Sequence, residues 1–267
     1  MVATRSVASG IGPGSLALLR YAIGGLLLLP VFLADRRRQV ALTDAAKIGG
    51  LGILQFAVVV GLLNLSLRHI PSARAALLFS LCPILTLILE SLLQRRWPTV
   101  LQSIGVLLAL AGVGVAFGWQ AIAGTVALSW LGDGCAFGSA WAAAVCALSY
   151  RPFLARYGAR RVGAYALPAA VVVLAALAAI EGFFTSPLLL SQAGWLSIFF
   201  IGGSSAVGYL LWLWALNRAS PTRVTVFLTL NPISAAAFGA LLLGECVGLA
   251  YAIGVIGVLC GIWLAYR

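Results

Sequence analysis

Nine apolar runs, each about as long as one membrane-spanning helix, follow one another along this chain of 267 residues. A bilayer core about 30 Å thick is crossed by about 20 apolar residues in α-helical conformation. Strands of a membrane barrel would alternate polar and apolar residues, whereas stretches such as AVVVLAALAAI are apolar on every side. The sequence therefore predicts an all-α, multi-pass membrane protein. The runs are Ser15–Leu33, Ile48–Leu67, Ala75–Leu93, Val100–Phe117, Ser129–Tyr150, Val162–Ile180, Trp195–Leu216, Val224–Leu243 and Val247–Tyr266.

The composition agrees with this class of protein. Hydrophobic residues make up 63% of the chain and charged residues only 9%, against about 25% charged residues in soluble proteins. A net charge of +11 would suggest a nucleic-acid partner in a soluble chain, but here the cations separate apolar runs. We therefore expect the lipid bilayer and a small-molecule substrate as partners, no nucleic acid, and we leave a homodimer open.

The positions of Arg and Lys predict the orientation, because cytoplasmic loops carry the excess of positive charge. Assigning the loops to alternate sides puts 13 of the 17 cations on one side. That assignment makes the C-terminus cytoplasmic and places Glu181 and Glu245 outside. The 13 cations are Arg36, Arg37, Arg38, Lys47, Arg95, Arg96, Arg151, Arg156, Arg160, Arg161, Arg218, Arg223 and Arg267.

Residues for metal binding or enzymatic chemistry do not form a recognisable pattern. The five cysteines include no C-x-x-C pair, and His69, the only histidine, falls in a loop between runs. No H-E-x-x-H motif or pair of aspartates is present. We predict no metal, no cofactor and no enzymatic activity.

An internal repeat appears when the sequence is shifted by 149 residues. The coincident residues are Arg74 and Arg223, Pro83 and Pro232, Gly105 and Gly254, and Gly112 and Gly261. The same shift places the run Ser129–Tyr150 before Met1, so the first repeat lacks its first helix. We predict repeats over residues 1–118 and 128–267. Five helices in each repeat would insert the second copy with inverted topology, as in secondary transporters.

Two segments resemble the EamA-type transporters of the drug/metabolite transporter superfamily. They are RHIPSARAALLFSLCPILTLILESLLQRRWPTVLQSIGVLLALAGV and NRASPTRVTVFLTLNPISAAAFGALLLGECVGLAYAIGVIGVLCGI. In both, a polar turn leads into a helix containing proline, then a second turn and a glycine-rich helix. Gly244 and Glu245 match the Gly-Glu of the family's second turn, whereas the first half has Arg95 and Arg96 there.

The resemblance implies a ten-helix fold of two five-helix repeats and a secondary transporter that exports or exchanges small metabolites or amino acids, without a cofactor. It implies alternating access and a bacterial cytoplasmic membrane as the location. The missing helix leaves an alternative, an inactive or accessory membrane fragment, and a membrane-embedded enzyme is a more distant one.

Three charged residues fall within the apolar runs, namely Arg20, Glu90 and Asp133. Each would cost about 2.5–3.5 kcal/mol at a helix centre, so such residues either pair near the interface or serve a pathway. Both readings stay open for all three. Among uncharged groups, Gln55 and Asn64 lie half a turn out of phase on one run, and we favour Gln55 for substrate binding.

Prolines and aromatic residues complete the candidate site. Pro83 and Pro232 interrupt helix hydrogen bonding inside their runs, so they predict kinked, gating helices whose Ser80 and Thr229 face a central path. Trp141 and Tyr209 lie away from the run ends where interfacial aromatics gather. In the family, the corresponding helices line the cavity, so we predict substrate contacts for both. Phe137 shares a helical face with Trp141, and Ser205 shares one with Tyr209. We therefore predict that Phe137 and Ser205 also contact the substrate.

Overall fold

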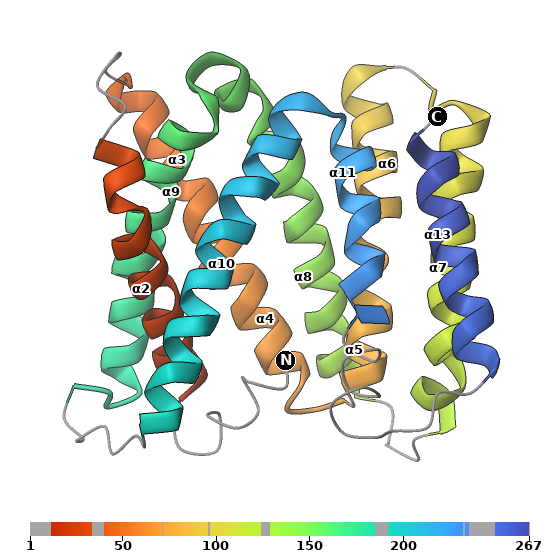
Figure 1. Cartoon of the computed structure of the whole chain (residues 1–267), viewed down its shortest axis with the longest axis horizontal. Coiled ribbons are helices and arrows are strands. Elements are labelled where there is room, and N and C mark those ends of the chain that lie inside the picture. Colours follow the sequence, from red (N-terminus) through yellow and green to blue (C-terminus); the bar gives the residue numbers. More distant parts are fainter. Residues whose placement is uncertain are drawn as a thin grey trace. The chain divides into compact units, whose positions relative to one another are not determined.

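The structure is a computed structural model that describes residues 12–33, 40–70, 72–95, 97–123, 129–184, 192–231, 233–234 and 249–266. Within these ranges all regular structure is helical (Figure 1). The elements are α2 (Pro13–Leu33), α3 (Leu42–Ile53), the π-helix η1 (Leu54–Val58), α4 (Val59–Ser66), α5 (Ser72–Phe79), α6 (Cys82–Gln94), α7 (Val100–Ala123), α8 (Trp130–Ser149), α9 (Arg151–Ile180), α10 (Gln192–Arg218), α11 (Pro221–Thr225), the 3₁₀-helix η2 (Val226–Thr229) and α13 (Leu249–Tyr266).

Eight of the nine predicted runs are found as apolar helices. Five described helical stretches are long and apolar enough to cross a membrane, and three shorter ones are also apolar. The long stretches are Leu42–Ser66, Ala75–Gln94, Trp130–Ser149, Arg151–Ile180 and Gly194–Arg218, and the shorter ones are Gly14–Pro30, Val100–Val115 and Ala252–Ala265. The prediction of an all-α membrane protein is confirmed. Much of the remaining run, Val224–Leu243, lies outside the described residues, as does Glu245.

The chain forms two compact units, and each takes helices from both halves of the sequence. Unit 1 comprises residues 1–61 and 149–218, and unit 2 comprises residues 62–148 and 219–267. The compact units are therefore distinct from the predicted sequence repeats, because the chain passes from one unit to the other three times.

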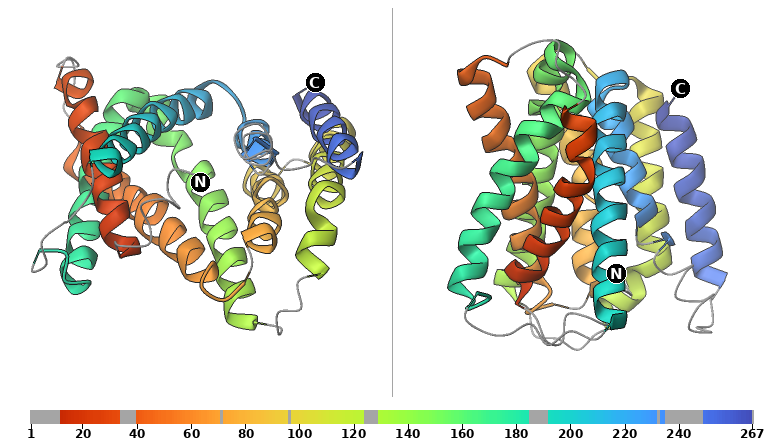
Figure 2. Two further views of the ribbon diagram at one scale, coloured as in Figure 1. Left: turned by 60° about the horizontal axis from the view of Figure 1, so that its bottom comes forward. Right: turned by 60° about the vertical axis from the view of Figure 1, so that its left-hand side comes forward.

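Unit 1 is held together by close contacts of α9 with α2, α3 and α10 and of α2 with α10 (Figure 2). Asp44 near the start of α3 contacts Arg156 near the start of α9, and further along Gly49 and Gly52 lie against Ala169 and Ala166, so these two helices run in the same direction. A Cβ at Gly52 would overlap the Ala166 carbonyl group. Small residues at helix interfaces let backbones approach closely, which is how membrane helices gain packing energy.

Unit 2 is centred on the antiparallel pair α7 and α13, which lie side by side in Figures 1 and 2. A Cβ built on Gly112 would lie 2.6 Å from the Gly254 oxygen, and one built on Gly261 would lie 2.6 Å from the Gly105 oxygen. Under the 149-residue shift, Gly254 corresponds to Gly105 and Gly261 corresponds to Gly112. The contacts Gly112–Gly254 and Gly105–Gly261 are therefore equivalent to each other. The fully buried Val106, Ala109, Val113 and Val258 surround these contacts.

The first proline-containing run is broken rather than kinked within one helix. Its helix ends at Phe79, turns through Ser80 and Leu81, and resumes as α6, with Pro83 in the first turn. The expectation that Pro83 removes a hydrogen bond from a helix interior is therefore wrong, because N–H groups of a first helical turn have no intrahelical acceptor. The second run changes from α11 to the 3₁₀ segment η2. Pro232 lies outside the described residues.

Two further irregularities lie in unit 1. The π-helix η1 interrupts the span Leu42–Ser66, and such bulges occur often at functional sites. Within α9, Gly158 has φ of 79°, a value that favours glycine, and it separates the first turns of α9 from its apolar part.

Candidate functional site

Arg20 occupies a polar position inside unit 1, between α2 and α10. Its Nε donates a hydrogen bond of 2.6 Å to Ser205 Oγ, and the Ser205 hydroxyl donates to the Ile201 carbonyl oxygen at 2.5 Å. The serine oxygen is thereby held as an acceptor for the guanidinium group. The Arg20 guanidinium carbon also lies 5.3 Å from the centre of the Tyr21 ring, within range of a cation–π attraction.

A row of aromatic rings continues from Tyr21 into the core of unit 1. The Tyr21 and Phe56 ring centres are 4.5 Å apart, and Phe56 meets Tyr209 edge to face at 4.7 Å. The Tyr209 hydroxyl then donates to the Tyr150 hydroxyl at 3.4 Å. All four rings are buried, so in this conformation they form a packed row beside Arg20.

The π-helix η1 contributes to this row. Phe56 lies inside η1 and is buried, whereas the preceding residue, Gln55, is partly buried. Gln55 therefore lies next to the aromatic row in sequence, and its predicted role in substrate binding stays a prediction. Asn64 belongs to unit 2.

Glu90 is the centre of a polar cluster in unit 2. Its carboxylate accepts hydrogen bonds from the Thr222 amide at 3.1 Å, from the Thr222 hydroxyl at 2.6 Å and from Gln94 Nε2 at 3.0 Å. The side chain is buried, with an exposed fraction of 8%. These bonds tie the last turns of α6 to the first turn of α11.

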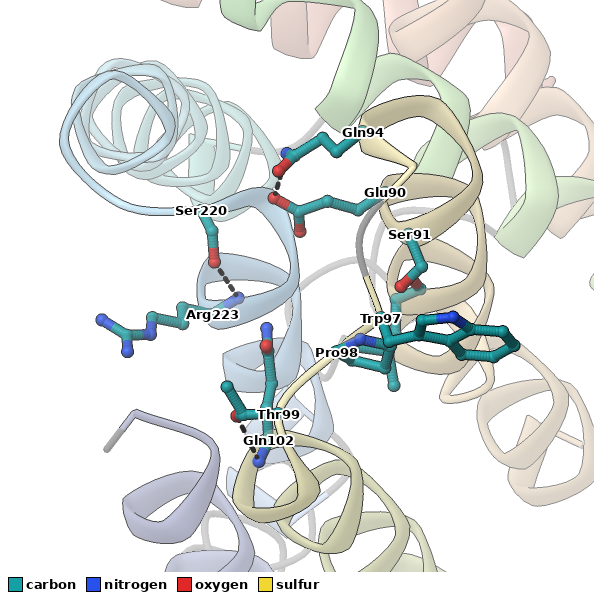
Figure 3. A pocket seen from close by; sticks show the side chains of 10 residues that line it. Glu90, Ser91, Gln94, Trp97, Pro98, Thr99, Gln102, Ser220 and Arg223 are labelled. Atoms are coloured by element: carbon teal, nitrogen blue, oxygen red, sulfur yellow. Dashed lines mark hydrogen bonds between the residues drawn. The ribbon is translucent and has the colours of Figure 1, made fainter.

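A cavity of about 280 Å³ lies next to this cluster (Figure 3). Figure 3 shows Glu90 and Gln94 on α6, Ser220 and Arg223 at the start of α11, and Gln102 on α7. The lining is strongly polar for an apolar chain. Its remaining residues are Leu87, Ser91, Trp97, Pro98 and Thr99.

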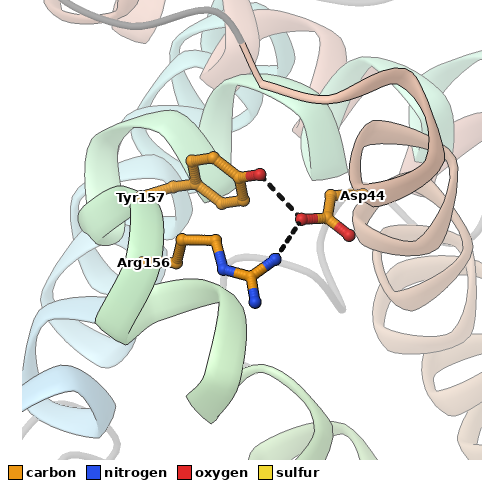
Figure 4. A network of polar contacts seen from close by, with 3 residues as sticks. All are labelled: Asp44, Arg156 and Tyr157. Atoms are coloured by element: carbon orange, nitrogen blue, oxygen red, sulfur yellow. Dashed lines mark hydrogen bonds and ion pairs between the residues drawn. The ribbon is translucent and has the colours of Figure 1, made fainter.

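Carboxylates also fasten both ends of α9 in unit 1. Near its start, Asp44 Oδ2 accepts hydrogen bonds from Arg156 Nη1 at 2.8 Å and from the Tyr157 hydroxyl at 2.7 Å (Figure 4). At its far end, Glu181 accepts bonds from the Gly14 and Ser15 amides, both at 2.9 Å. The second contact supplies an anion to the N-terminus of α2, where backbone N–H groups lack intrahelical acceptors.

The predicted site residues belong to both units. Arg20, Ser205 and Tyr209 come together in unit 1, while Trp141 and Phe137 are 44% and 43% exposed on α8 of unit 2.

The hydroxyl groups next to the helix breaks bond within their own segments. Ser80 donates to the Ala76 carbonyl group and Thr229 to the Val226 carbonyl group. Asp133 lies in the first turn of α8. Among the described residues, no group of three or more His, Cys, Asp or Glu side chains is placed to hold a metal ion.

Several residues of these sites could not be singled out from the sequence. Tyr21, Phe56 and Tyr150 look like ordinary apolar positions in their runs, and only their spatial neighbours reveal the row. Asp44 offered a weak signal, because it is an acid in the first turn of a helix. Its partner Arg156 is 112 positions away in the sequence.

The helices define the protein as a multi-pass membrane protein, and comparisons define its family. The sequence matches the EamA-like transporter family over residues 1–118 and 130–267, so the chain belongs to that family.

Two curated relatives are similar along most of the chain. A protein of Archaeoglobus fulgidus named "Uncharacterized transporter" is 29% identical over 262 residues, which is 96% of this chain and 90% of that protein. A "Probable terminal-alkyne amino-acid exporter" of Streptantibioticus cattleyicolor is 30% identical over 242 residues, which is 88% of this chain and 78% of that protein.

One solved crystal structure matches the fold with a TM-score of 0.81. The match covers 99% of this chain and 93% of the other, at 21% sequence identity. At that identity the likeness concerns the fold alone, and it agrees with the all-α architecture.

Proposed function

We propose that this membrane protein is a secondary transporter that exports or exchanges small metabolites, amino acids among them, by alternating access. The supporting observation is the α7–α13 pair, whose glycines contact one another reciprocally across two helices that run in opposite directions. Inverted repeats built around such pseudo-twofold contacts are the common plan of transporters that open alternately to each side.

Broken helices support the same proposal. Under the 149-residue shift, η2 corresponds to residues 77–80, so it overlaps the break at Ser80 and Leu81 by one position. Discontinuous helices in corresponding positions of two halves are typical of transporter binding sites, because they free polar backbone groups and allow one half-helix to move.

The proposal includes the organisation expected from the sequence. Residues 1–118 and 128–267 would be the two repeats, and the C-terminus would be cytoplasmic, in a bacterial cytoplasmic membrane. Amino acids are favoured as substrates because one relative carries the name of an amino-acid exporter. Arg20 and Ser205 in unit 1 offer polar groups that could bind the charged end of an amino acid.

Counterflow in reconstituted vesicles tests this function. The full chain would be placed in liposomes loaded with an unlabelled mixture of amino acids, and entry of the labelled acids would be followed. We expect saturable entry that is faster with internal amino acids than without them. In an exchanger, the binding site turns back toward the outside with an internal amino acid bound, so internal substrate speeds each cycle. Entry equal to that of protein-free liposomes, with no stimulation from inside, would contradict the proposal.

A further inference from the structure

Arg20 is a cation deep inside an apolar helix. It is the eighth residue of α2, about 10 Å along a helix of 21 residues. A charged side chain at such a depth is expensive and is a functional-site hypothesis by default. The two carboxylates among the described residues of unit 1, Asp44 and Glu181, bind Arg156 with Tyr157 and the start of α2, respectively.

The hydrogen bond to Ser205 fixes the direction of the guanidinium group. Nε is occupied, so the remaining donors are the two Nη groups at the tip of the side chain. Within the described part of the chain, the polar contact of Arg20 is this one bond, together with the Tyr21 ring. Two parallel Nη–H groups match the two oxygens of a carboxylate, which they bind in a bidentate manner.

Arg20 is only partly buried, so part of its side chain is accessible to a solute. Gly208 lies three residues after Ser205 on α10, so the two share a helical face. A Cβ added at Gly208 would meet nothing within 4 Å. Tyr21 and Ala206, the sequence neighbours of Arg20 and Ser205, are buried, so the guanidinium group is the charged group that a solute would meet there.

We propose that Arg20 binds the carboxylate group of the transported solute, with Ser205 as its positioning residue. The inference rests on the proposed function and adds a substrate class, small carboxylates with an apolar body. A bound carboxylate would neutralise the guanidinium charge within the apolar helix, so recognition of the solute and compensation of this partly buried charge would occur in one contact.

Matched ligand pairs and a matched arginine test the proposal. Ligands are L-leucine, L-phenylalanine and L-threonine, each compared with its amide, which keeps the body and the amine but has no carboxylate. Binding to the purified full chain in detergent is measured by the shift of its thermal midpoint. The variants are Arg20→Gln, Arg20→Lys and the control Arg218→Gln, because Arg218 also lies over an aromatic ring, 4.2 Å from the Trp214 centre, but is exposed.

We expect at least one acid to bind the wild type about 10- to 100-fold more tightly than its amide, as loss of a charge-assisted contact predicts. Arg20→Gln should bring that ratio close to one without weakening the amide, Arg20→Lys should give an intermediate ratio, and Arg218→Gln should leave it unchanged. The proposal is overturned when no acid binds the wild type better than its amide, or when Arg20→Gln keeps the ratio. Equal weakening of acid and amide, with a lower thermal midpoint, would make Arg20 a structural contact and would also overturn it.

Failure of the proposed function gives a different result. Selective acid binding that depends on Arg20, in a chain that moves no solute in counterflow, would refute transport and still support the carboxylate site. Exchange that is unaffected by Arg20→Gln, with an unchanged preference for acids, would refute the site and support transport.

Discussion

Adding one methyl group at Gly112 is expected to weaken the α7–α13 pair. The new Cβ would lie 2.6 Å from the Gly254 oxygen and 2.7 Å from the Val258 nitrogen, both of them backbone atoms that cannot rotate away. Restoring ordinary contact would require the helices to separate by about 1 Å, and a gap of about 0.5–1 Å forfeits a quarter to a half of the dispersion attraction. Overpacking of this kind costs about 1–3 kcal/mol.

A second glycine on the same helix provides the control. A Cβ at Gly114 would meet nothing within 4 Å, so Gly114→Ala gains only helix propensity, up to about 1 kcal/mol. Gly112→Ala gains the same propensity, and the difference between the two variants therefore isolates the helix contact.

Unfolding of the purified protein in mixed detergent micelles, followed by circular dichroism, measures that difference. We expect Gly112→Ala to be less stable than Gly114→Ala by about 1–3 kcal/mol, and Gly261→Ala to resemble Gly112→Ala. Equal stability of the Gly112 and Gly114 variants would refute the argument that backbone contact at these glycines holds unit 2 together.

Three other predictions address the polar cluster, the orientation and the broken helix. Glu90→Ala should lower the free energy of unfolding by about 1–3 kcal/mol, because donors at the start of α11 lose their buried acceptor, whereas Ser91→Ala, which removes a bond within one helix, should change it little. Cysteine at position 181 should react with an impermeant reagent from outside and cysteine at position 37 should not, and the reverse pattern would refute the orientation. Pro83→Ala should leave the thermal midpoint unchanged or raise it, because the alanine N–H can donate a hydrogen bond that joins α5 with α6. The same change should slow exchange, since the break between the two helices is then lost. Unchanged exchange would make this break purely structural.

The sequence alone predicts the apolar helices, and it further predicts two repeats. Apolar length identifies eight described helices, because burial in lipid requires about 20 apolar residues whatever their identity. The shift that pairs Gly105 with Gly254 and Gly112 with Gly261 indicates two related halves. It gives no information on which helices touch, so the reciprocal contact of these glycines emerges only in three dimensions.

The candidate sites were predicted less completely, for a physical reason. In so apolar a chain, a polar residue is recognisable by its rarity, as Arg20 and Glu90 were, but its partner is common and distant. Thr222 is 132 residues from Glu90, and Ser205 is 185 residues from Arg20. The break before Pro83 was misread as an interior kink, since a proline in an apolar run fits both a kink and a first helical turn.

The interleaving of the two units has a consequence for how the protein is made. Unit 1 takes its last helix from α10, and unit 2 takes its last helix from α13, so the early helices of both units are synthesised long before their partners. Between the end of α7 and the start of α13 lie about 125 residues, or roughly 6–25 s of translation at about 5–20 residues per second. During that time the glycine-lined face of α7 is without its α13 partner in the membrane. This interval is when an insertase or membrane chaperone would be needed, and when a quality-control protease would have access to the nascent chain.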